Sequence, residues 1–402
     1  MVRIGLMAAV LVFALFAGWR VVGQMQSERY ARTDPARALA WRPNHPLALQ
    51  VLAQKQLDAG ELDRAQATAR QLLAHEPLHG VGYRLLAQVA EQQGRKDKAL
   101  RLYTIAERRA PRDLLTRAWL AQHHLEQGQV APALDQVDRI LRMSPQRARS
   151  INPVLIQLAQ DPAFADALAR KLAGNPPWRP GLLAALRDPK AGNPAANGRV
   201  MEALQAQGGL TPEEYSRWLD SLIASGRWGE AYARWAGTVA KPDGRLPLVY
   251  NGDFSQAISG AGFDWRLRRV PGVLASVEPG NGRGGQAAYL RFLDRRVATA
   301  GLEQPLLLGP GRYRLTARMR AQGLRSATGL QWVVGCVGKG STVARLDPVD
   351  GNHDWREFVT DFTVPAGCDG QWLRLVNPVA DGAAQRVAGS LWVDDVKIVP
   401  HH

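Results

Sequence analysis

The sequence predicts an α + β multidomain protein with an N-terminal membrane anchor, an α-helical array and a C-terminal antiparallel β-sandwich. Three observations indicate this: an apolar N-terminal segment, an internal period of 34 residues, and a change from helical to strand periodicity after residue 240. A length of 402 residues with 46% hydrophobic and 22% charged residues is typical of two or three globular domains. The predicted segments are an anchor (1–23), a repeat array (24–145), degenerate helical repeats that cap it (146–240), a linker (241–247) and a sandwich (248–402).

The N-terminal segment is apolar from Ile4 to Gly18 and extends to Gly23 if Arg20 reaches the membrane interface with its long side chain. Fifteen apolar residues also suit the core of a signal peptide, but no small-x-small cleavage site precedes Gln24. An uncleaved single-pass anchor is therefore favoured over a signal peptide. Either alternative exports the chain that follows, so we expect a protein of the bacterial inner membrane with its bulk in the periplasm.

A 34-residue period runs through the first third of the chain. Four independent markers share it. They are Pro43, Pro77, Pro111 and Pro145; Gly60, Gly94 and Gly128; Ala65, Ala99 and Ala133; and the triplet Leu-Ala-Gln at 52–54, 86–88 and 120–122. Small residues let two antiparallel helices approach closely, a glycine ends the first helix in a left-handed cap, and a proline stops the second.

This pattern resembles the tetratricopeptide repeat, and the unit at 80–113 matches it best, with Tyr83 and Tyr103 in the aromatic positions. The resemblance implies binding of protein partners along a concave face built by the first helices. Four side chains are candidates for that face: Gln54, Arg84, Gln88 and Gln122. The alternative is that the glutamines are merely polar positions facing solvent.

The region after residue 248 has short β-prone runs separated by Gly, Pro and Asp turns, as in a β-sandwich. The predicted strands are 287–292, 312–318, 330–337, 355–364, 371–376 and 390–399. Cys336 and Cys368, the two cysteines of the chain, both fall in this region. A disulfide between them is favoured over two buried thiols and agrees with an exported domain.

Two strings bracket the domain: Asn251-Gly-Asp-Phe at its start and Trp392-Val-Asp-Asp-Val near its end. Their order and spacing resemble jelly-roll carbohydrate-binding modules associated with xylanases. That family often holds a structural calcium ion between the two chain ends, so the resemblance implies Asp395 and carbonyl groups near Asn251 as its ligands. The family commonly has Glu after the Phe, whereas this chain has Ser255, so one ligand is missing.

Tryptophan side chains are the natural platforms for sugar rings, because an indole offers an apolar face and planar polar neighbours grip hydroxyl groups. Trp355 and Trp392 adjoin the family's core motifs and are predicted to be buried. Trp265 and Trp332 are the better platform candidates, although burial in the core remains the favoured alternative for both. Asp264, Arg266 and Gln331 are their candidate polar neighbours.

No nucleophile elbow, phosphate-binding loop or metal-binding helix motif occurs, so the sequence predicts a binding protein and not an enzyme. Of the formal charge of +15, +11 falls on the helical residues 1–245 and +4 on residues 246–402. The basic helical half favours anionic lipid headgroups or an acidic polysaccharide as partner, and nucleic acid is not expected for an exported protein. We therefore expect a periplasmic scaffold that binds protein partners and polysaccharide, accessory to making or exporting a surface polysaccharide. The alternatives are a glycan-active enzyme and an assembly factor that binds protein alone.

Overall fold

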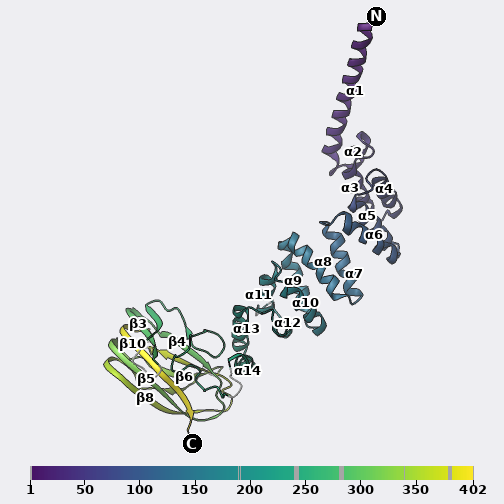
Figure 1. Cartoon of the computed structure of the whole chain (residues 1–402). Coiled ribbons are helices and arrows are strands. Elements are labelled where there is room, and N and C mark those ends of the chain that lie inside the picture. Colours follow the sequence, from purple (N-terminus) through teal and green to yellow (C-terminus); the bar gives the residue numbers. More distant parts are fainter. Residues whose placement is uncertain are drawn as a thin grey trace. The chain divides into compact units, whose positions relative to one another are not determined.

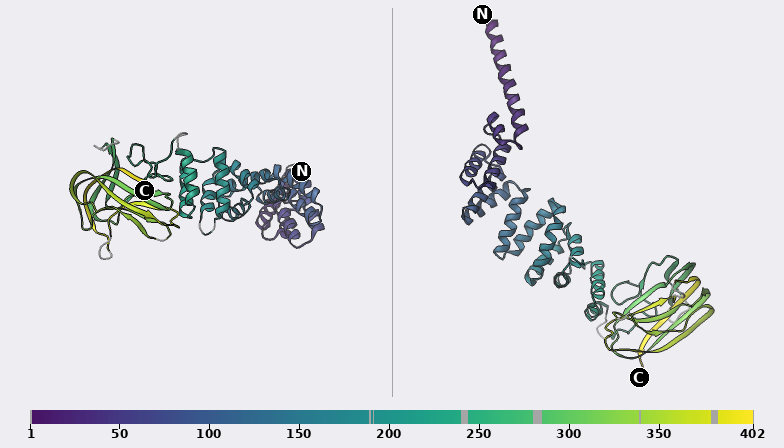
Figure 2. Two further views of the ribbon diagram at one scale, coloured as in Figure 1. Left: turned by 90° about the horizontal axis from the view of Figure 1, so that it is seen from below. Right: turned by 180° about the vertical axis from the view of Figure 1, so that it is seen from behind.

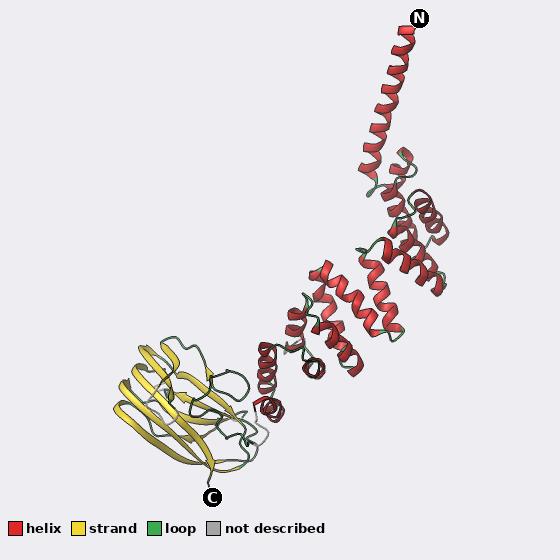
Figure 3. Ribbon diagram, viewed as in Figure 1, coloured by secondary structure: helices red, strands yellow, loops and turns green. Residues whose placement is uncertain are grey.

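A computed structural model describes residues 2–188, 190, 192–239, 244–279, 285–338, 340–378 and 383–401, without the side chains of residues 2–10 and 12. The chain forms two compact units, Met1–Gly209 and Leu210–His402. The described strands are confined to the second unit (Figures 1 and 3).

Unit 1 is helical. Its elements are α1 (Val2–Tyr30), α2 (Pro35–Trp41), α3 (Pro46–Asp58), α4 (Leu62–His75), α5 (Gly80–Gln92), α6 (Lys96–Arg109), α7 (Leu114–Glu126), α8 (Val130–Met143), a 3₁₀ turn (Pro145–Arg147), α9 (Ala148–Leu158), α10 (Pro162–Ala173), α11 (Arg179–Arg187) and α12 (Pro194–Ala206). From α3 to α8 they follow one another as antiparallel hairpins, which Figure 2 shows from two further sides.

The 34-residue period corresponds to these hairpins. Gly60, Gly94 and Gly128 adopt φ values of 76°, 73° and 69°, the left-handed conformation that a helix-ending glycine supplies. Ala87 and Ala99 are 0% exposed where α5 packs on α6, since a larger side chain would force the two helices apart. The predicted helical hairpins are confirmed.

Of the predicted anchor over 1–23, residues 2–23 lie within α1, and residue 1 lies outside the described part of the chain. Among the residues that the structure describes, no helix combines the length and the apolar character needed to span a membrane. The anchor is thus without structural support and stays a prediction.

Unit 2 joins a helical hairpin to a sandwich of two antiparallel five-stranded sheets. Sheet A has the order β1-β4-β9-β6-β7, and sheet B has the order β2-β3-β10-β5-β8. The elements are α13 (Pro212–Ala224), α14 (Trp228–Val239), β1 (Arg266–Leu267), β2 (Val273–Pro279), β3 (Gln286–Arg296), β4 (Thr299–Leu306), β5 (Gly311–Ser326), β6 (Gln331–Cys336), β7 (Thr342–Arg345), β8 (Gly351–Val364), β9 (Gln371–Val376) and β10 (Arg386–Pro400).

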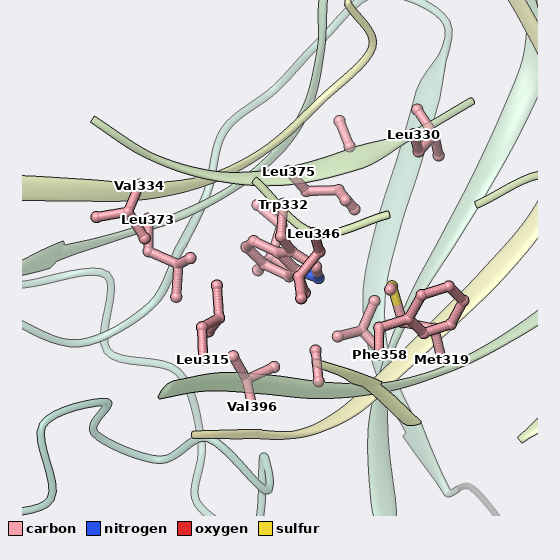
Figure 4. Packing of buried hydrophobic residues seen from close by; sticks show 14 of the residues in the cluster. Leu315, Met319, Leu330, Trp332, Val334, Leu346, Phe358, Leu373, Leu375 and Val396 are labelled. Atoms are coloured by element: carbon pink, nitrogen blue, oxygen red, sulfur yellow. The ribbon is translucent and has the colours of Figure 1, made fainter. Parts of the chain in front are cut away.

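The six predicted strands all occur, as β3, β5, β6, β8, β9 and β10. Sequence reasoning missed β1, β2, β4 and β7. The core lies between the sheets, where Leu315 and Met319 of sheet B face Leu373 and Leu375 of sheet A (Figure 4). Alternate residues of each central strand point into this core and the others point outward.

The α13–α14 hairpin belongs to the sandwich unit, whereas the sequence assigned residues up to 240 to the repeat array. Its aromatic side chains pack on sandwich residues, with Trp235 5.0 Å from Tyr250 and Tyr232 5.0 Å from Phe263 between ring centroids. Of the predicted linker over 241–247, residues 241–243 lie outside the described part of the chain.

The predicted disulfide is confirmed. Cys336 at the end of β6 is bonded to Cys368 in the loop before β9, with the two Cα atoms 5.5 Å apart. Both residues are buried. The bond therefore fastens the β9 loop to the neighbouring strand of sheet A.

Candidate functional site

The candidate sugar platforms Trp265 and Trp332 are core residues, so the platform role is wrong and the alternative that the sequence left open is confirmed. Both are 0% exposed, and their rings lie 5.7 Å apart between centroids. The indole N–H of Trp265 donates to the carbonyl of Asn251 at 2.9 Å. Figure 4 shows Trp332 among leucines and valines of both sheets. Neither ring has a face that a sugar can reach.

The candidate polar neighbours of these tryptophans also have structural roles. The Asp264 carboxylate accepts two hydrogen bonds of 2.7 Å from Ser259, one from its backbone N–H and one from its hydroxyl. Arg266 is 5% exposed and donates to Asp220 of α13 at 2.7 Å. Burial lowers the pKa of the Arg266 guanidinium, and Asp220 opposes that shift. Gln331 is partly exposed, but the indole beside it points into the core.

The outward side of sheet B, here called the open face, holds the aromatic side chains that the sequence analysis expected to be buried. In β10, Leu391 and Val393 are 0% exposed and point inward, so Trp392 between them points outward and is partly exposed. Trp355 on β8 is partly exposed as well. The prediction that Trp355 and Trp392 are core is therefore wrong.

Strand register sets the open-face side chains in a row. Ser276 of β2 pairs with Tyr289 of β3, Tyr289 with Trp392 of β10, and Trp392 with Arg320 of β5. The rings of Tyr289 and Trp392 lie 4.9 Å apart between centroids. Five strands at a spacing of about 4.8 Å give this face a width of roughly 19 Å.

Arginine side chains lie between these rings. The Arg320 guanidinium carbon is 5.1 Å from the centroid of the Trp392 ring, and that of Arg318 is 5.6 Å from the Trp355 ring. Arg318 pairs in register with Glu357 of β8 on one side and Asp394 of β10 on the other. The open face therefore combines flat apolar rings with planar hydrogen-bonding groups.

The alternation of side chains along β10 could have predicted from the sequence that Trp392 faces outward. Leucine and valine at 391 and 393 must share one face of a strand, and that face is the core because it is the more apolar. Trp392 then falls on the opposite face.

The residues expected to hold calcium do not fit that ion. The carbonyl oxygen of Asn251 already accepts two N–H groups, from Trp265 Nε1 and from Phe254, and the Asn251 carboxamide makes two hydrogen bonds to the backbone of Gln256. A carbonyl has two lone pairs, so none remains for a metal. The Asp395 carboxylate contacts the ammonium group of Lys397. No cluster of three or more His, Cys, Asp or Glu suited to a metal occurs among the residues described.

The two bracketing strings meet through packing instead. Val396 N–H donates to the carbonyl of Gly252 at 2.8 Å. A Cβ at position 252 would lie 2.0 Å from the Val396 carbonyl oxygen. The motif thus requires glycine because the closing strand passes directly over it.

Three of the four groove candidates in the repeat array come together. The buried Arg84 of α5 donates from one Nη1 atom to Gln54 of α3 at 3.1 Å and to Gln88 at 2.8 Å. Its Nε lies 3.1 Å from the Asp113 carboxylate, which also caps α7. Gln122 stands apart and bonds to Glu126. Arg84 therefore links two successive repeats, and through Asp113 the start of the third, beneath the partly exposed Gln54 and Gln88.

An aromatic stack that sequence reasoning missed lies beside this network. Trp119 of α7 stacks on Tyr103 of α6 with centroids 3.9 Å apart, and the indole N–H donates to Glu91 at 2.6 Å. Tyr103 also donates to Glu91, and burial together with this carboxylate raises the pKa of the Tyr103 phenol. The stack fastens one repeat to the next.

The chain is similar in part to several known proteins. Over 170 residues, 40% of this chain, the sequence is 33% identical to cellulose synthase 2 operon protein C of Komagataeibacter xylinus, of whose length the match spans 13%. A thermophilic tetratricopeptide repeat protein of Thermus thermophilus is 20% identical, covering 52% of this chain and 98% of its own, with a TM-score of 0.26. A CBM22-1 xylan-binding domain of Paenibacillus barcinonensis is 14% identical, covering 37% of this chain and 91% of its own, with a TM-score of 0.26. The family model of the tetratricopeptide repeat matches residues 51–113 and 84–148, so this part of the chain is a tetratricopeptide repeat array.

Proposed function

We propose that the chain is a scaffold protein whose repeat array binds a protein partner and whose open face binds a polysaccharide. We propose further that it assists in making or exporting a surface polysaccharide and has no catalytic role of its own. The relative from Komagataeibacter xylinus is named for a cellulose synthase operon, which supports a role in polysaccharide production.

The observation that carries the proposal is the row across sheet B that contains Tyr289, Trp392 and Arg320. The axial C–H groups of a sugar ring pack on an aromatic face, and guanidinium and carboxylate groups bind its hydroxyls. An extended β-linked glycan advances by about one strand spacing per sugar, so it can place successive rings along such a row.

The charges of the open face favour an uncharged glycan. Arg314 forms two hydrogen bonds, of 2.7 and 2.9 Å, to the Asp361 carboxylate, and the pair neutralises both groups. Arg318 lies between Glu357 and Asp394 in the strand register. Asp394 is 0% exposed, so the exposed Glu357 carboxylate beside Arg318 is the group that would repel the carboxylate groups of an acidic polysaccharide. The earlier expectation of an acidic polysaccharide rested on the basic helical half of the chain, whereas this proposal concerns the open face of the sandwich.

The protein partner is proposed to lie along α3 and α5, where Gln54 and Gln88 stand over Arg84. Their amide groups suit the hydrogen-bonding groups of a peptide backbone.

The buried disulfide supports work in an oxidising compartment, and we propose the periplasm. Several described side chains of α1 are apolar and exposed, including Phe13 and Trp19, which supports attachment of this helix to the inner membrane. A C-terminal alkaline phosphatase fusion should be active and a green fluorescent protein fusion dark. The opposite pattern rejects this location.

The binding proposal is tested by titrating the full chain with a soluble neutral β-1,4-glucan, a neutral xylan and anionic polygalacturonate. Trp392→Ala should weaken binding to a neutral glycan by about 1–3 kcal/mol, the usual range for loss of an aromatic anchor. Val359→Ala is the matched control, because Val359 is 47% exposed on β8 and lies outside the row. Equal loss in both variants, or binding to none of the three polymers, overturns the proposal. Release of reducing sugar would instead favour an enzyme.

A further inference from the structure

The α13–α14 hairpin is docked on the outer side of sheet A through two tryptophans seated over glycines. A Cβ on Gly370 would lie 2.2 Å from the Trp228 ring, and one on Gly262 would lie 2.2 Å from the Trp235 ring. Trp228 and Trp235 are each only 3% exposed. Both positions therefore require glycine, because any side chain there would occupy the space of an indole.

Trp228 occupies a socket that consists of Gly370 and the rings of Trp372 and Phe263. The Trp228 ring meets Trp372 of β9 at 84° and Phe263 at 76°, with centroids 5.9 Å apart in both pairs. Its indole nitrogen has no hydrogen-bond partner among the described residues. Shape alone holds this side chain, so its docking depends on the position of the Gly370 backbone.

The disulfide sets that position. Cys368 lies two residues before Gly370, and its partner Cys336 directly precedes Val337, whose N–H donates to the Gly370 carbonyl at 3.0 Å. On the other side, the buried Gln371 side chain donates to the carbonyl of Cys368 at 2.7 Å. The socket loop is thus held covalently at one point and by hydrogen bonds at two others.

We propose that the Cys336–Cys368 bond acts as a clamp that docks the α13–α14 hairpin on the sandwich. The hairpin is then an integral part of unit 2, and the folded module begins near residue 210. A module that begins at residue 248, the predicted start of the sandwich, lacks the hairpin and exposes the apolar surface around Trp372 and Phe263. This inference is independent of any glycan bound to the open face.

Hydrogen–deuterium exchange of the full chain tests the clamp. The double variant Cys336→Ala/Cys368→Ala should exchange the amides of α13 and α14 at least tenfold faster, while β5 and β10 in the centre of sheet B keep their protection. Gly370→Ala should give the same result with the disulfide intact, because the new methyl group displaces Trp228. Gly309→Ala is the control, since a Cβ there meets nothing within 4 Å.

Two outcomes overturn the proposal. Unchanged exchange in the hairpin of the double variant would mean that the bond has no part in docking. An equal rise in the amide exchange rates of all strands and of the hairpin would mean that the bond stabilises the whole sandwich and has no specific effect on docking of the hairpin. If the double variant fails to fold, the Gly370→Ala variant provides the test. Amide exchange in α13 and α14 of Gly370→Ala that equals the exchange in Gly309→Ala would reject docking of Trp228 over Gly370.

Discussion

The indole rings of Trp265 and Trp332 lie 5.7 Å apart between the two sheets, and both side chains are fully buried. Trp265 additionally donates its N–H to the Asn251 carbonyl and so ties the core to the chain segment that opens the sandwich. This pair anchors the domain from within, so the proposed contacts with a glycan are assigned to Tyr289 and Trp392 on the open face.

Trp265→Ala should destabilise the sandwich by about 3–5 kcal/mol, because it empties a large buried site and leaves the Asn251 carbonyl with one donor fewer. Urea denaturation of the full chain followed by near-UV circular dichroism measures this. Trp392→Ala, on the open face, should cost far less. A larger loss of stability in Trp392→Ala than in Trp265→Ala would contradict the assignment of Trp265 to the core and Trp392 to the open face.

The glutamines of the repeat array should not behave alike. Gln54→Ala with Gln88→Ala removes both acceptors of the Arg84 Nη1 group, so it should destabilise unit 1 by about 1–3 kcal/mol. Gln122→Ala should change stability by less than about 0.5 kcal/mol, since Gln122 is exposed. Thermal unfolding at 222 nm compares the variants. A double variant as stable as Gln122→Ala would show that the Arg84 network contributes nothing.

Calcium should not affect the stability of the sandwich, because the oxygen atoms around Asn251 already accept hydrogen bonds and Asp395 contacts Lys397. A ligand that binds only the folded state at 100 times its dissociation constant adds about 2.7 kcal/mol. Such binding would raise the melting temperature by several degrees in a domain of this size. Scanning calorimetry in 1 mM calcium chloride and in excess chelator should give superimposable curves. A rise of the melting temperature in calcium chloride would contradict this prediction and support a calcium site.

Acidification should weaken unit 1 through His79. The Nδ1 atom of this residue accepts a hydrogen bond of 3.3 Å from the Gly82 N–H and caps α5, a role that requires the neutral ring. Burial lowers the pKa of His79 below its ordinary value of 6.5, against the opposing effect of Glu76. The unfolded chain therefore binds the proton more readily, so stability falls as the pH drops through 6.5 towards the folded-state pKa.

Denaturation midpoints at pH 7.5 and 5.5 test this. His79→Asn keeps a capping side chain without a titrating group, so it should show a smaller fall between the two pH values. An identical fall in the variant would assign the pH dependence to other groups.

Local signals in the sequence determined the repeat array and most of the strands. Gly94 and Pro111 act on their own stretch of backbone, and recurrence of such markers every 34 residues identifies the hairpins without knowledge of their packing. The disulfide could be predicted as well, since two cysteines in one domain leave a single intramolecular pairing. Both conclusions rest on residues that act on near neighbours or that have one possible partner.

Tertiary structure alone decided which aromatic side chains face solvent and where the units divide. A strand has two faces, and only pairing with its neighbours and with the opposite sheet determines which face is buried, so Trp392 and Trp265 exchanged their expected roles. The α13–α14 hairpin looks like a further repeat in sequence. It joins the sandwich because Trp228 finds its socket at Gly370, a contact between residues far apart in the chain that no local pattern records.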